Sequence, residues 1–597
     1  MASYLDPTTH FNFTSQPQTE LNNRTIQIIG GAILGGSSGV NAMVMSRGQR
    51  EDYDRWGAYF GPGGKAEWSW DKILPYFRKA WHFHPPDKQL TKEFGIKYDT
   101  KYWGTTSNIH ASFAPFIYPF VSTFVPVTCP LSDPHPLLIH HPKNTERMLG
   151  VWAEIPGVEF PPDSGAGKPG VFFYPSSVDP STRTRSFARS GHFDHAAHRS
   201  NHHVLTEHRV LRVLFDKSKR ATSVAYLPRT SRSLAAAKTV RAKKEVILAA
   251  NTLHTPQILQ ASGLGPRRLL AAAGIPLIHH LPGVGQNFQD HPFIVGAHFA
   301  FSSFPYHPDP SDLYTNQTFI DLARRQFDRD RTGPLSVAVG ASAVFLSFPV
   351  IAPDAHAAIA ARFAAQHPAA HLPPDSDPAV IAGYAAQQSA QAAMMRSRGS
   401  AIFNLLSHGG PTEGAIELMH PTSRGTVNID PADPFFAEPH VDYRALTNPA
   451  DADILVEFTR FTRRVFTTTT ITELGPVEVY PGADIVEPED IVQWLRERMI
   501  PSSYHAIGTC AMMPQRLGGV VDQKLRVYGV KGLSIVDASV IPDQPGAYTQ
   551  QTVYAIAEKV SLWCCDEWFR GLVPRANIVF FLGGRSHQGS GVEGCIS

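Results

Sequence analysis

Several stretches of the chain alternate between apolar and polar residues in the manner of β-strands. Residues 202–216 (HHVLTEHRVLRVLFD) and 221–227 (ATSVAYL) alternate in this way across a short polar segment, which predicts a hairpin-like pair of strands. Residues 244–251 (KEVILAAN) form a short apolar run, and the HTPQILQASG segment beyond it has helical spacing. The order strand, turn, helix favours an α/β sheet in this part of the chain.

The C-terminal part shows the same order of elements. Residues 533–542 (LSIVDASVIP) are predicted to be a second buried strand ending at Asp537, and residues 552–560 (TVYAIAEKV) a helix. Between about 351 and 400 the chain is rich in Ala, His, Pro and Gln, which predicts helical decoration or a mobile insertion. The tail after Trp563 ends polar and Gly-rich, unlike the rest.

Length and charge narrow the class of protein. A chain of 597 residues with 43% hydrophobic and 18% charged residues is expected to form two or more globular lobes. A net charge of +2 gives no electrostatic case for nucleic acid or an anionic membrane, so we predict neither as a partner. No apolar run approaches the ~20 residues of a membrane span. Residues 1–13 lack the features of a signal peptide, so we predict a cytoplasmic protein, or a secreted one if the true N-terminus lies upstream.

Cysteine and histidine give no sign of a metal or of disulfides. The five cysteines are scattered, with neither zinc-site spacing nor a disulfide framework, which favours an intracellular enzyme. Histidine is abundant at 27 residues, but no HxxxH or HxH pattern has a carboxylate immediately next to it in the sequence. We therefore assign no metal.

The stretch Ile28–Asn41 (IIGGAILGGSSGVN) poses the question of a phosphate-binding loop. A dinucleotide loop needs G-x-G-x-x-G between a strand and a helix, so that backbone can approach the pyrophosphate. The glycines here stand at 30, 31, 35, 36 and 39, and no three of them fit that spacing. We predict a Gly/Ser loop that leads into a helix-like segment, GVNAMVM, rather than the first βαβ turn.

Six motifs occur in order along the chain: LGGSSGVNAMVMSRG, TLHTPQILQASGLG, LPGVGQNFQDHP, MHPTSRGTVNI, SYHAIGTCAMM and VDASVIP. Together they resemble the glucose-methanol-choline (GMC) family of FAD-dependent oxidoreductases, in the manner of fungal alcohol oxidases and dehydrogenases of secondary metabolism. The resemblance spans roughly residues 10–560.

The resemblance implies a mixed α/β fold with an FAD-binding Rossmann-like domain and a substrate-binding domain built on an antiparallel sheet with helices. In that family the GGSS loop packs over the flavin, and the G-x-G-x-x-G unit precedes it. We expect that unit upstream of this chain. The Rossmann-like domain would then lack its first βαβ unit, and both ends of the chain would be products of an incomplete gene model. The predicted divisions are 1–300 (FAD-binding segments about 21–60 and 185–295, a substrate-domain segment about 61–184), 301–500 for substrate binding, 501–562 for FAD binding and catalysis, and the atypical tail 563–597.

The same resemblance assigns residues to the cofactor. The GGSS-x-x-N loop is expected near the isoalloxazine and the strand-end residues near the adenine and pyrophosphate, although Val210 and Ala250 taken alone would be plain core. Asn251 stands where the family has glycine. The expected FAD-binding residues are Gly35, Gly36, Ser37, Asn41, Val44, Val210, Ala250, Asp537, Ala538 and Gln550.

His505 and Tyr548 are the candidate catalytic residues. The family motif H-x-x-G-T-C falls on His505–Cys510, and an imidazole with a pKa near ~6.5 suits a base that takes a hydroxyl proton. The second family position, normally His or Asn, is Tyr548. A phenol donates hydrogen bonds, but its pKa near ~10 makes it a poor proton acceptor. This departure puts ordinary alcohol oxidation in question.

Three functions therefore remain open. The leading one is an FAD-dependent dehydrogenase or oxidase that acts on the CH–OH group of a small alcohol and passes electrons to oxygen or a quinone. The second is a non-redox cyclase or dehydratase on the same scaffold, with the flavin in a structural role. The third is an inactive, truncated remnant that does not bind FAD.

Overall fold

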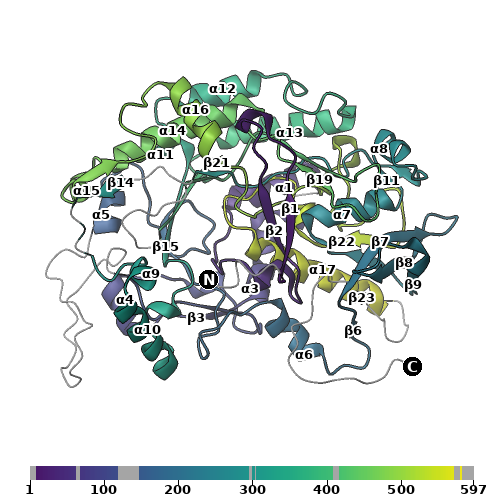
Figure 1. The fold of residues 1–597 in the computed structure, drawn as a ribbon, viewed down its shortest axis with the longest axis horizontal. Coiled ribbons are helices and arrows are strands. Elements are labelled where there is room, and N and C mark those ends of the chain that lie inside the picture. Colours follow the sequence, from purple (N-terminus) through teal and green to yellow (C-terminus); the bar gives the residue numbers. More distant parts are fainter. Residues whose placement is uncertain are drawn as a thin grey trace.

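A six-stranded antiparallel sheet forms one half of the molecule (Figure 1). The computed structural model describes residues 8–118, 147–294, 299–407, 416–570 and 579–580, apart from positions 62, 64–66, 303 and 305. The order of the sheet is β21 (Met499–Ile500), β13 (Phe293–Ile294), β17 (Ile416–Leu418), β16 (Phe403–Ser407), β15 (Ser342–Leu346) and β5 (Gly170–Phe173), and every pair is antiparallel.

Helices cover one face of this sheet, and the apolar cluster of Val44 and Tyr548 covers the other. All five residues of β15 are buried, as expected of a strand covered on both faces. The Ala-rich region is helical, as one of its two predicted alternatives had it, with α12 (His356–Ala365) and α13 (Pro378–Met394). They share a core with the long helix α14 (Pro449–Val465), into which Phe363 and Phe458 are fully buried. The rows of small alanines allow this close packing.

The second half contains the predicted α/β elements. β10 (Val246–Leu248) pairs in parallel with β22 (Leu533–Ile535), and helix α7 (Asn251–Ala261) follows β10 as predicted. Within the described residues, β10 pairs with β22 alone. Helix α17 (Gln550–Arg570) packs along α3 (Trp70–Ala80).

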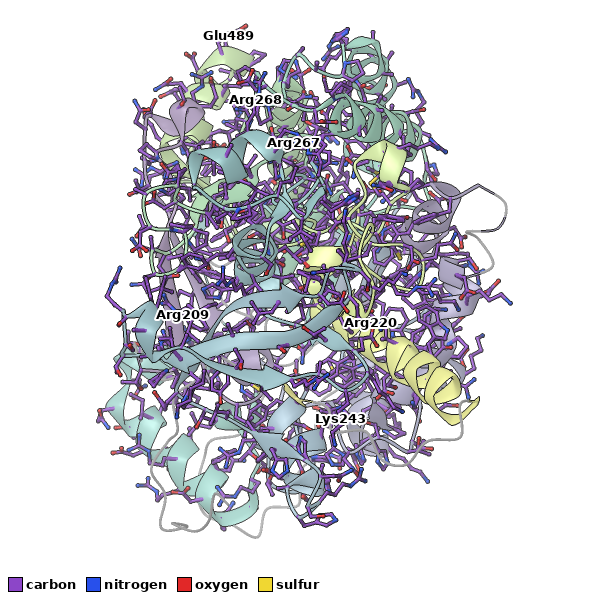
Figure 2. All side chains as sticks on the ribbon, turned by 90° about the vertical axis from the view of Figure 1, so that its right-hand side faces the viewer. Arg209, Arg220, Lys243, Arg267, Arg268 and Glu489 are labelled. Atoms are coloured by element: carbon purple, nitrogen blue, oxygen red, sulfur yellow. The ribbon has the colours of Figure 1, made fainter. Side chains whose placement is uncertain are left out.

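The predicted hairpin is confirmed. β7 (His208–Phe215) pairs antiparallel with β8 (Ala221–Pro228), and β9 (Lys238–Arg241) extends the sheet beyond β8. Figure 2 looks towards this sheet, with Arg209 and Arg220 labelled near its two ends. Its inner residues, such as Val213 and Val224, join the core around β10.

The Gly/Ser stretch differs from its prediction after residue 39. A 3₁₀ turn covers Gly36–Gly39, but the expected helix-like GVNAMVM segment is not helical. The Asn41 side chain accepts a bond from the Met43 amide at 3.0 Å, Met43 has a φ of 64°, and Val44 forms a β-bridge with Ser176. This local side-chain bond and the bridge outweigh the helical spacing, so the prediction was wrong.

Within the described residues, no helix is both long and apolar enough to cross a membrane.

The remaining elements connect these two halves. Their bounds are β1 (His10–Thr14), β2 (Gln27–Gly31), α1 (Arg50–Ala58), β3 (His82–His84), α4 (Lys88–Phe94), β4 (His110–Ser112), α5 (Arg147–Ala153), α6 (Asp194–Ala196), β6 (His203–Val204), β11 (Leu264–Gly265), α8 (Arg267–Ala272), β12 (His279–His280), β14 (Phe299–Phe301), α9 (Asp312–Thr315), α10 (Gln317–Asp330), α11 (Phe348–Ile351), β18 (Thr426–Asn428), β19 (His440–Asp442), α15 (Thr469–Thr472), β20 (Pro476–Glu478), α16 (Pro488–Arg498) and β23 (Val579–Phe580).

Candidate active site

The structure brings the two predicted catalytic residues together. The rings of His505 and Tyr548 lie with their centroids 4.9 Å apart, although 42 residues lie between them in the sequence. His505 lies in the loop after β21, and Tyr548 lies just before α17. The pair therefore sits where the antiparallel sheet meets the C-terminal segment.

Three contacts fix His505. Its backbone amide donates to Asp290 Oδ1 at 2.9 Å, and its carbonyl accepts from Gln544 Nε2 at 3.0 Å. Its ring Nδ1 lies 3.1 Å from Nδ1 of His291. Burial lowers the pKa of His505 to about 3, far below the ~6.5 on which its role as a base was predicted. The imidazole is therefore neutral at physiological pH, but it is a weaker base than the sequence led us to expect.

Tyr548 is held from the opposite side by the antiparallel sheet. Its hydroxyl donates to Asn404 Oδ1 at 2.8 Å, and its backbone amide donates to Ser46 Oγ at 3.3 Å. Burial, reinforced by the nearby charge of Glu417, raises the pKa of the phenol well above its usual value. Tyr548 is thus a hydrogen-bonded neutral phenol.

Two buried carboxyl groups flank the pair, and sequence reasoning assigned a role to neither. Glu417 lies directly across from Asn404 in the β16–β17 register. Burial raises the pKa of Glu417 to about 7, against the opposing effect of the Ser503 and Tyr548 hydroxyls. Burial likewise raises the pKa of Asp290 to about 7. The sequence signal for Glu417 was an acidic residue inside the apolar run AIELM, and the signal for Asp290 was the QDHP motif.

The Gly/Ser loop lies beside this pair. Val44 is buried in the same apolar cluster as Tyr548. Gly35 and Gly36 have φ angles of 99° and 58°, and a Cβ on Gly36 would meet nothing within 4 Å. Ser37 Oγ accepts a bond from the Gly31 amide at 3.1 Å, which closes the loop.

The Asn41 side chain anchors the end of this loop. Asn41 Oδ1 accepts from Arg185 Nη1 at 2.8 Å as well as from the Met43 amide. Gln550, at the start of α17, donates to Ser177 Oγ at 3.3 Å, next to the residue that bridges to Val44. Asn41, Val44, Gln550 and Tyr548 therefore gather on one side of the site.

A second group of predicted residues meets at the N-terminus of α7. Asp537 accepts bonds from the Asn251 amide at 3.1 Å and from Thr255 Oγ1 at 2.5 Å. Ala250 and Ala538 are half-buried at the margin of the same core cluster, and Val210 lies at that margin too. The expected adenine-side residues therefore border one cluster, which is equally what plain core residues would do.

Helix α7 joins the two groups. Thr252 Oγ1 donates to the Ala506 carbonyl at 2.8 Å, and Thr509 Oγ1 donates back to the Thr252 carbonyl at 2.7 Å. The first turn of α7 is thereby tied to the residues that follow His505. These two hydrogen bonds connect the residues predicted to bind the cofactor with those predicted to be catalytic.

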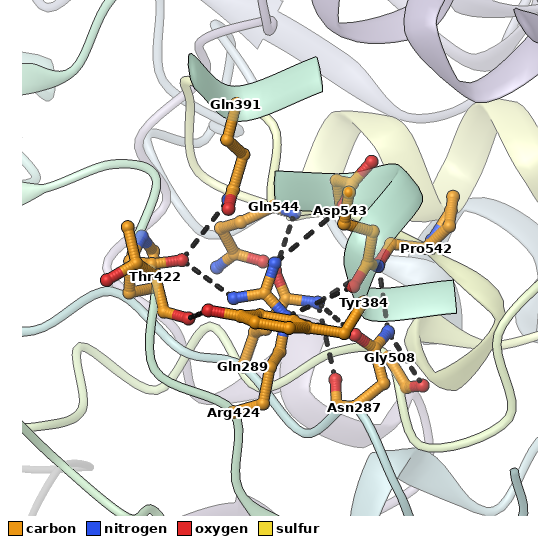
Figure 3. A network of polar contacts seen from close by, with 12 residues as sticks. Asn287, Gln289, Tyr384, Gln391, Thr422, Arg424, Gly508, Pro542, Asp543 and Gln544 are labelled. Atoms are coloured by element: carbon orange, nitrogen blue, oxygen red, sulfur yellow. Dashed lines mark hydrogen bonds and ion pairs between the residues drawn. The ribbon is translucent and has the colours of Figure 1, made fainter. Parts of the chain in front are cut away.

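A buried network around Arg424, in the MHPTSRG motif, holds the segment that leads to Tyr548 (Figure 3). Arg424 Nε donates to Asn287 Oδ1 at 3.0 Å. Asn287 and Gln387 in turn donate to the Pro542 carbonyl at 2.9 and 2.8 Å. Three elements of the fold thus converge on the turn that precedes Tyr548.

Comparisons with known proteins identify the family. Residues 12–293 and 421–557 match the two parts of the GMC oxidoreductase family. The chain is 34% identical over 564 residues to the dehydrogenase xptC of Emericella nidulans, with 93% of this chain and 84% of the relative covered. It is 30% identical to the dehydrogenase mpl7 of Monascus purpureus, with 93% and 87% covered.

Solved structures agree with this assignment. An FAD-dependent oxidoreductase from Chaetomium thermophilum is 35% identical, with a TM-score of 0.86 and 95% of this chain and 91% of that chain covered. A fungal aryl-alcohol oxidase is 30% identical, with a TM-score of 0.86 and 95% and 90% covered. The chain belongs to the GMC oxidoreductase family, which confirms the resemblance seen in its motifs.

Proposed function

We propose that this chain is an FAD-dependent oxidoreductase that oxidises the CH–OH group of a small alcohol in fungal secondary metabolism. The observation that carries the proposal is the His505–Tyr548 pair, with centroids 4.9 Å apart, beside the loop of Val44. The dehydrogenase relatives support the reaction class. The aryl-alcohol oxidase and the buried aromatic rings of Phe345 and Tyr174 around Tyr548 support an aromatic alcohol.

The contact between His505 and His291 assigns the proton-accepting atom. Burial lowers the pKa of His291 well below its usual value, and the carbonyls of Met419 and Pro545 only partly offset this effect. Within the described residues His291 Nε2 is buried without a hydrogen-bond partner, and Nδ1 faces His505. We assign the His291 proton to Nε2 in this proposal, so that His291 Nδ1 accepts and His505 Nδ1–H donates. This tautomer leaves the lone pair of His505 Nε2 free to take the hydroxyl proton of an alcohol.

Tyr548 and Glu417 position the substrate in this proposal. With its phenol proton engaged by Asn404, Tyr548 presents its oxygen as an acceptor and its ring as an apolar wall. The substrate oxygen is therefore directed to His505 and not to Tyr548. When FAD is bound, it supplies the hydride acceptor, N5.

The residues present suit a flavin at its ring end. Gly36 leaves open space beside its backbone, and Val44 offers a buried apolar contact. At the other end, half-buried Val210 and Ala250 offer apolar surface next to the N-terminus of α7, where the Asp537 carboxylate accepts from the Asn251 amide. Asn41 and Gln550 complete the polar contacts at the ring.

The pyrophosphate contacts differ from those of a standard Rossmann loop. No G-x-G-x-x-G spacing occurs in the Gly/Ser stretch, and β10 has β22 as its one partner within the described residues.

The test is made on the purified full-length chain. Visible absorption in the flavin region and FAD released by denaturation establish whether the cofactor binds. Anaerobic addition of primary aromatic alcohols should then bleach the flavin, and admission of oxygen or a quinone identifies the electron acceptor. A folded chain without flavin would sink the proposal and favour the inactive remnant.

One observation keeps the non-redox alternative in view. Glu417, with a pKa near 7, is a buried acid that lies beside the neutral phenol of Tyr548. Such an acid can protonate a leaving hydroxyl, as a dehydratase or cyclase requires. Turnover of substrate without flavin bleaching under anaerobic conditions would favour this alternative, whereas bleaching on substrate addition would exclude it.

A further inference from the structure

Strands β3 and β4 place three histidines on one face, away from the active-site pair. His82 and His84 are two positions apart on β3 and so point to the same side of the strand. β4 runs parallel to β3, with His110 opposite His82 in the register. On the reverse face, Phe83 and Ala111 are buried in an apolar core. The backbone therefore presents the three imidazoles together and half-buried.

The rings are close enough to share one ligand. His84 Nε2 lies 2.8 Å from His110 Nδ1, and the rings of His82 and His84 are stacked with centroids 4.4 Å apart. One nitrogen from each of the three residues lies within 4.8 Å of the others. Three polar imidazoles at a half-exposed site are not stabilised by hydrophobic burial. Packing alone therefore does not explain why the three rings lie so close together.

Asp179 adds a second, independent feature. Its Oδ1 accepts bonds from the Ser181 amide at 2.8 Å and the Ser181 hydroxyl at 2.6 Å. Its Oδ2 faces Nε2 of His110 at 3.9 Å. His110 therefore has Nδ1 towards the other histidines and Nε2 towards a carboxylate. The 3.9 Å separation is longer than a hydrogen bond, and a closer approach would give the arrangement in which an outer carboxylate orients a metal-binding histidine.

We propose that His82, His84 and His110 bind one divalent transition-metal ion, with Asp179 as the positioning residue for His110. Imidazole donors suit Zn²⁺, Cu²⁺ and Ni²⁺. Metal–nitrogen bonds of about 2.0–2.1 Å put neighbouring donors about 3.3 Å apart in a tetrahedral site. Small rotations of His84 and His110 open their contact to that spacing. Three protein ligands leave a fourth position for water or a small ligand.

Binding of this ion would also affect the Gly/Ser loop, where the flavin is expected to bind. The turn that begins at Asp179 leads to Arg185, which donates to Asn41 at the end of the Gly/Ser loop. Asp179 also offsets the positive charge of Arg183, which lies near His84. A metal that fixes β3 and β4 against this turn would therefore stiffen the base of the loop that carries Asn41.

The experiment uses the full-length chain without a polyhistidine tag, stripped with EDTA and dialysed. Titration with Zn²⁺ followed by calorimetry should show one equivalent bound, and Cu²⁺ should give an EPR spectrum with splitting from nitrogen ligands. His84→Ala should weaken binding at least about 100-fold, since loss of a ligand exceeds the 10–100-fold effect of an outer carboxylate. Asp179→Asn should weaken binding about 10–100-fold.

The matched control is His307→Ala. His307 lies with Asp309 and Asp312 in another group that could hold an ion, and it is more exposed than the proposed ligands. The control should bind as the parent does. His110→Gln, which keeps the size of the side chain, replaces His84→Ala if that variant unfolds on circular dichroism. Absence of a bound equivalent, binding unchanged by the histidine substitutions, or binding lost in His307→Ala would each overturn the proposal.

Discussion

Nδ1 of His505 faces Nδ1 of His291 at 3.1 Å, and this contact decides which nitrogen of His505 can act as a base. Only one of the two atoms can carry the shared proton. In the proposed mechanism His291 carries its proton on Nε2, so His505 donates through Nδ1 and keeps Nε2 free. The following predictions concern the holoenzyme of the proposed function.

Replacing His505 with Ala should leave flavin binding intact and slow anaerobic flavin reduction by ~10²–10⁴-fold, the usual effect of losing a general base. Stopped-flow absorption measures the reduction, and the flavin-to-protein absorbance ratio measures binding. His367→Ala, at an exposed position on the helical side, is the control and should reduce at the parent rate. Unchanged kinetics in His505→Ala would remove this residue from the mechanism.

His291→Leu should slow flavin reduction because it removes the acceptor that fixes the His505 tautomer, and we expect an effect of ~10-fold or more. His291→Asn keeps an acceptor oxygen towards His505 and a donor towards the carbonyls, so it should recover part of the rate. Equal rates in the two variants would show that His291 acts by packing alone. Their thermal unfolding midpoints separate that outcome from loss of fold.

Tyr548 should respond differently to two kinds of substitution. Tyr548→His or Tyr548→Asn should raise turnover on a panel of simple alcohols, since each restores a side chain that can accept a proton or hydrogen bond beside His505. Tyr548→Phe should not raise it, and should destabilise the fold by about 1–3 kcal/mol because Asn404 loses a buried partner. No gain on any alcohol would count against Tyr548 as the residue that limits substrate choice.

The parts of the fold that were predicted are those with local signals. The β7–β8 hairpin, the β10–α7 unit and α17 each follow from hydrophobic periodicity within a few residues of chain. The GVNAMVM segment shows the limit of that reasoning. Its spacing is helical, yet the pairing of Val44 with Ser176, more than a hundred positions away, sets its conformation. Such pairings leave no local trace.

The same limit applies to the site. His505 and Tyr548 were predicted to be catalytic from their positions in the family pattern, and the structure adds that their rings lie side by side. Glu417 lies in no motif to which a role was assigned, and its importance comes from the register that sets it opposite Asn404. The histidines of β3 show the same point, since His110 joins them through strand pairing and not through spacing in sequence.

Glu417 should make stability depend on pH. Because its pKa is raised to about 7 in the folded state, the folded protein holds a proton that the unfolded chain releases near its ordinary value of 4.5. The contribution of Glu417 to the free energy of unfolding is therefore greatest below about pH 4.5, and it falls as pH rises towards 7. The loss is on the order of 3 kcal/mol at 1.36 kcal/mol per pKa unit.

Glu417→Gln tests this directly, because the amide cannot ionise. Between pH 5 and pH 8 the variant should lose less stability than the parent, measured as the shift of the urea unfolding midpoint. Some slope should remain, because Asp290 also has a pKa raised to about 7. Glu497→Gln, at an exposed position of α16, should keep the parent slope. Parallel pH profiles for Glu417→Gln and the parent would show that Glu417 ionises as freely in the folded protein as in the unfolded chain.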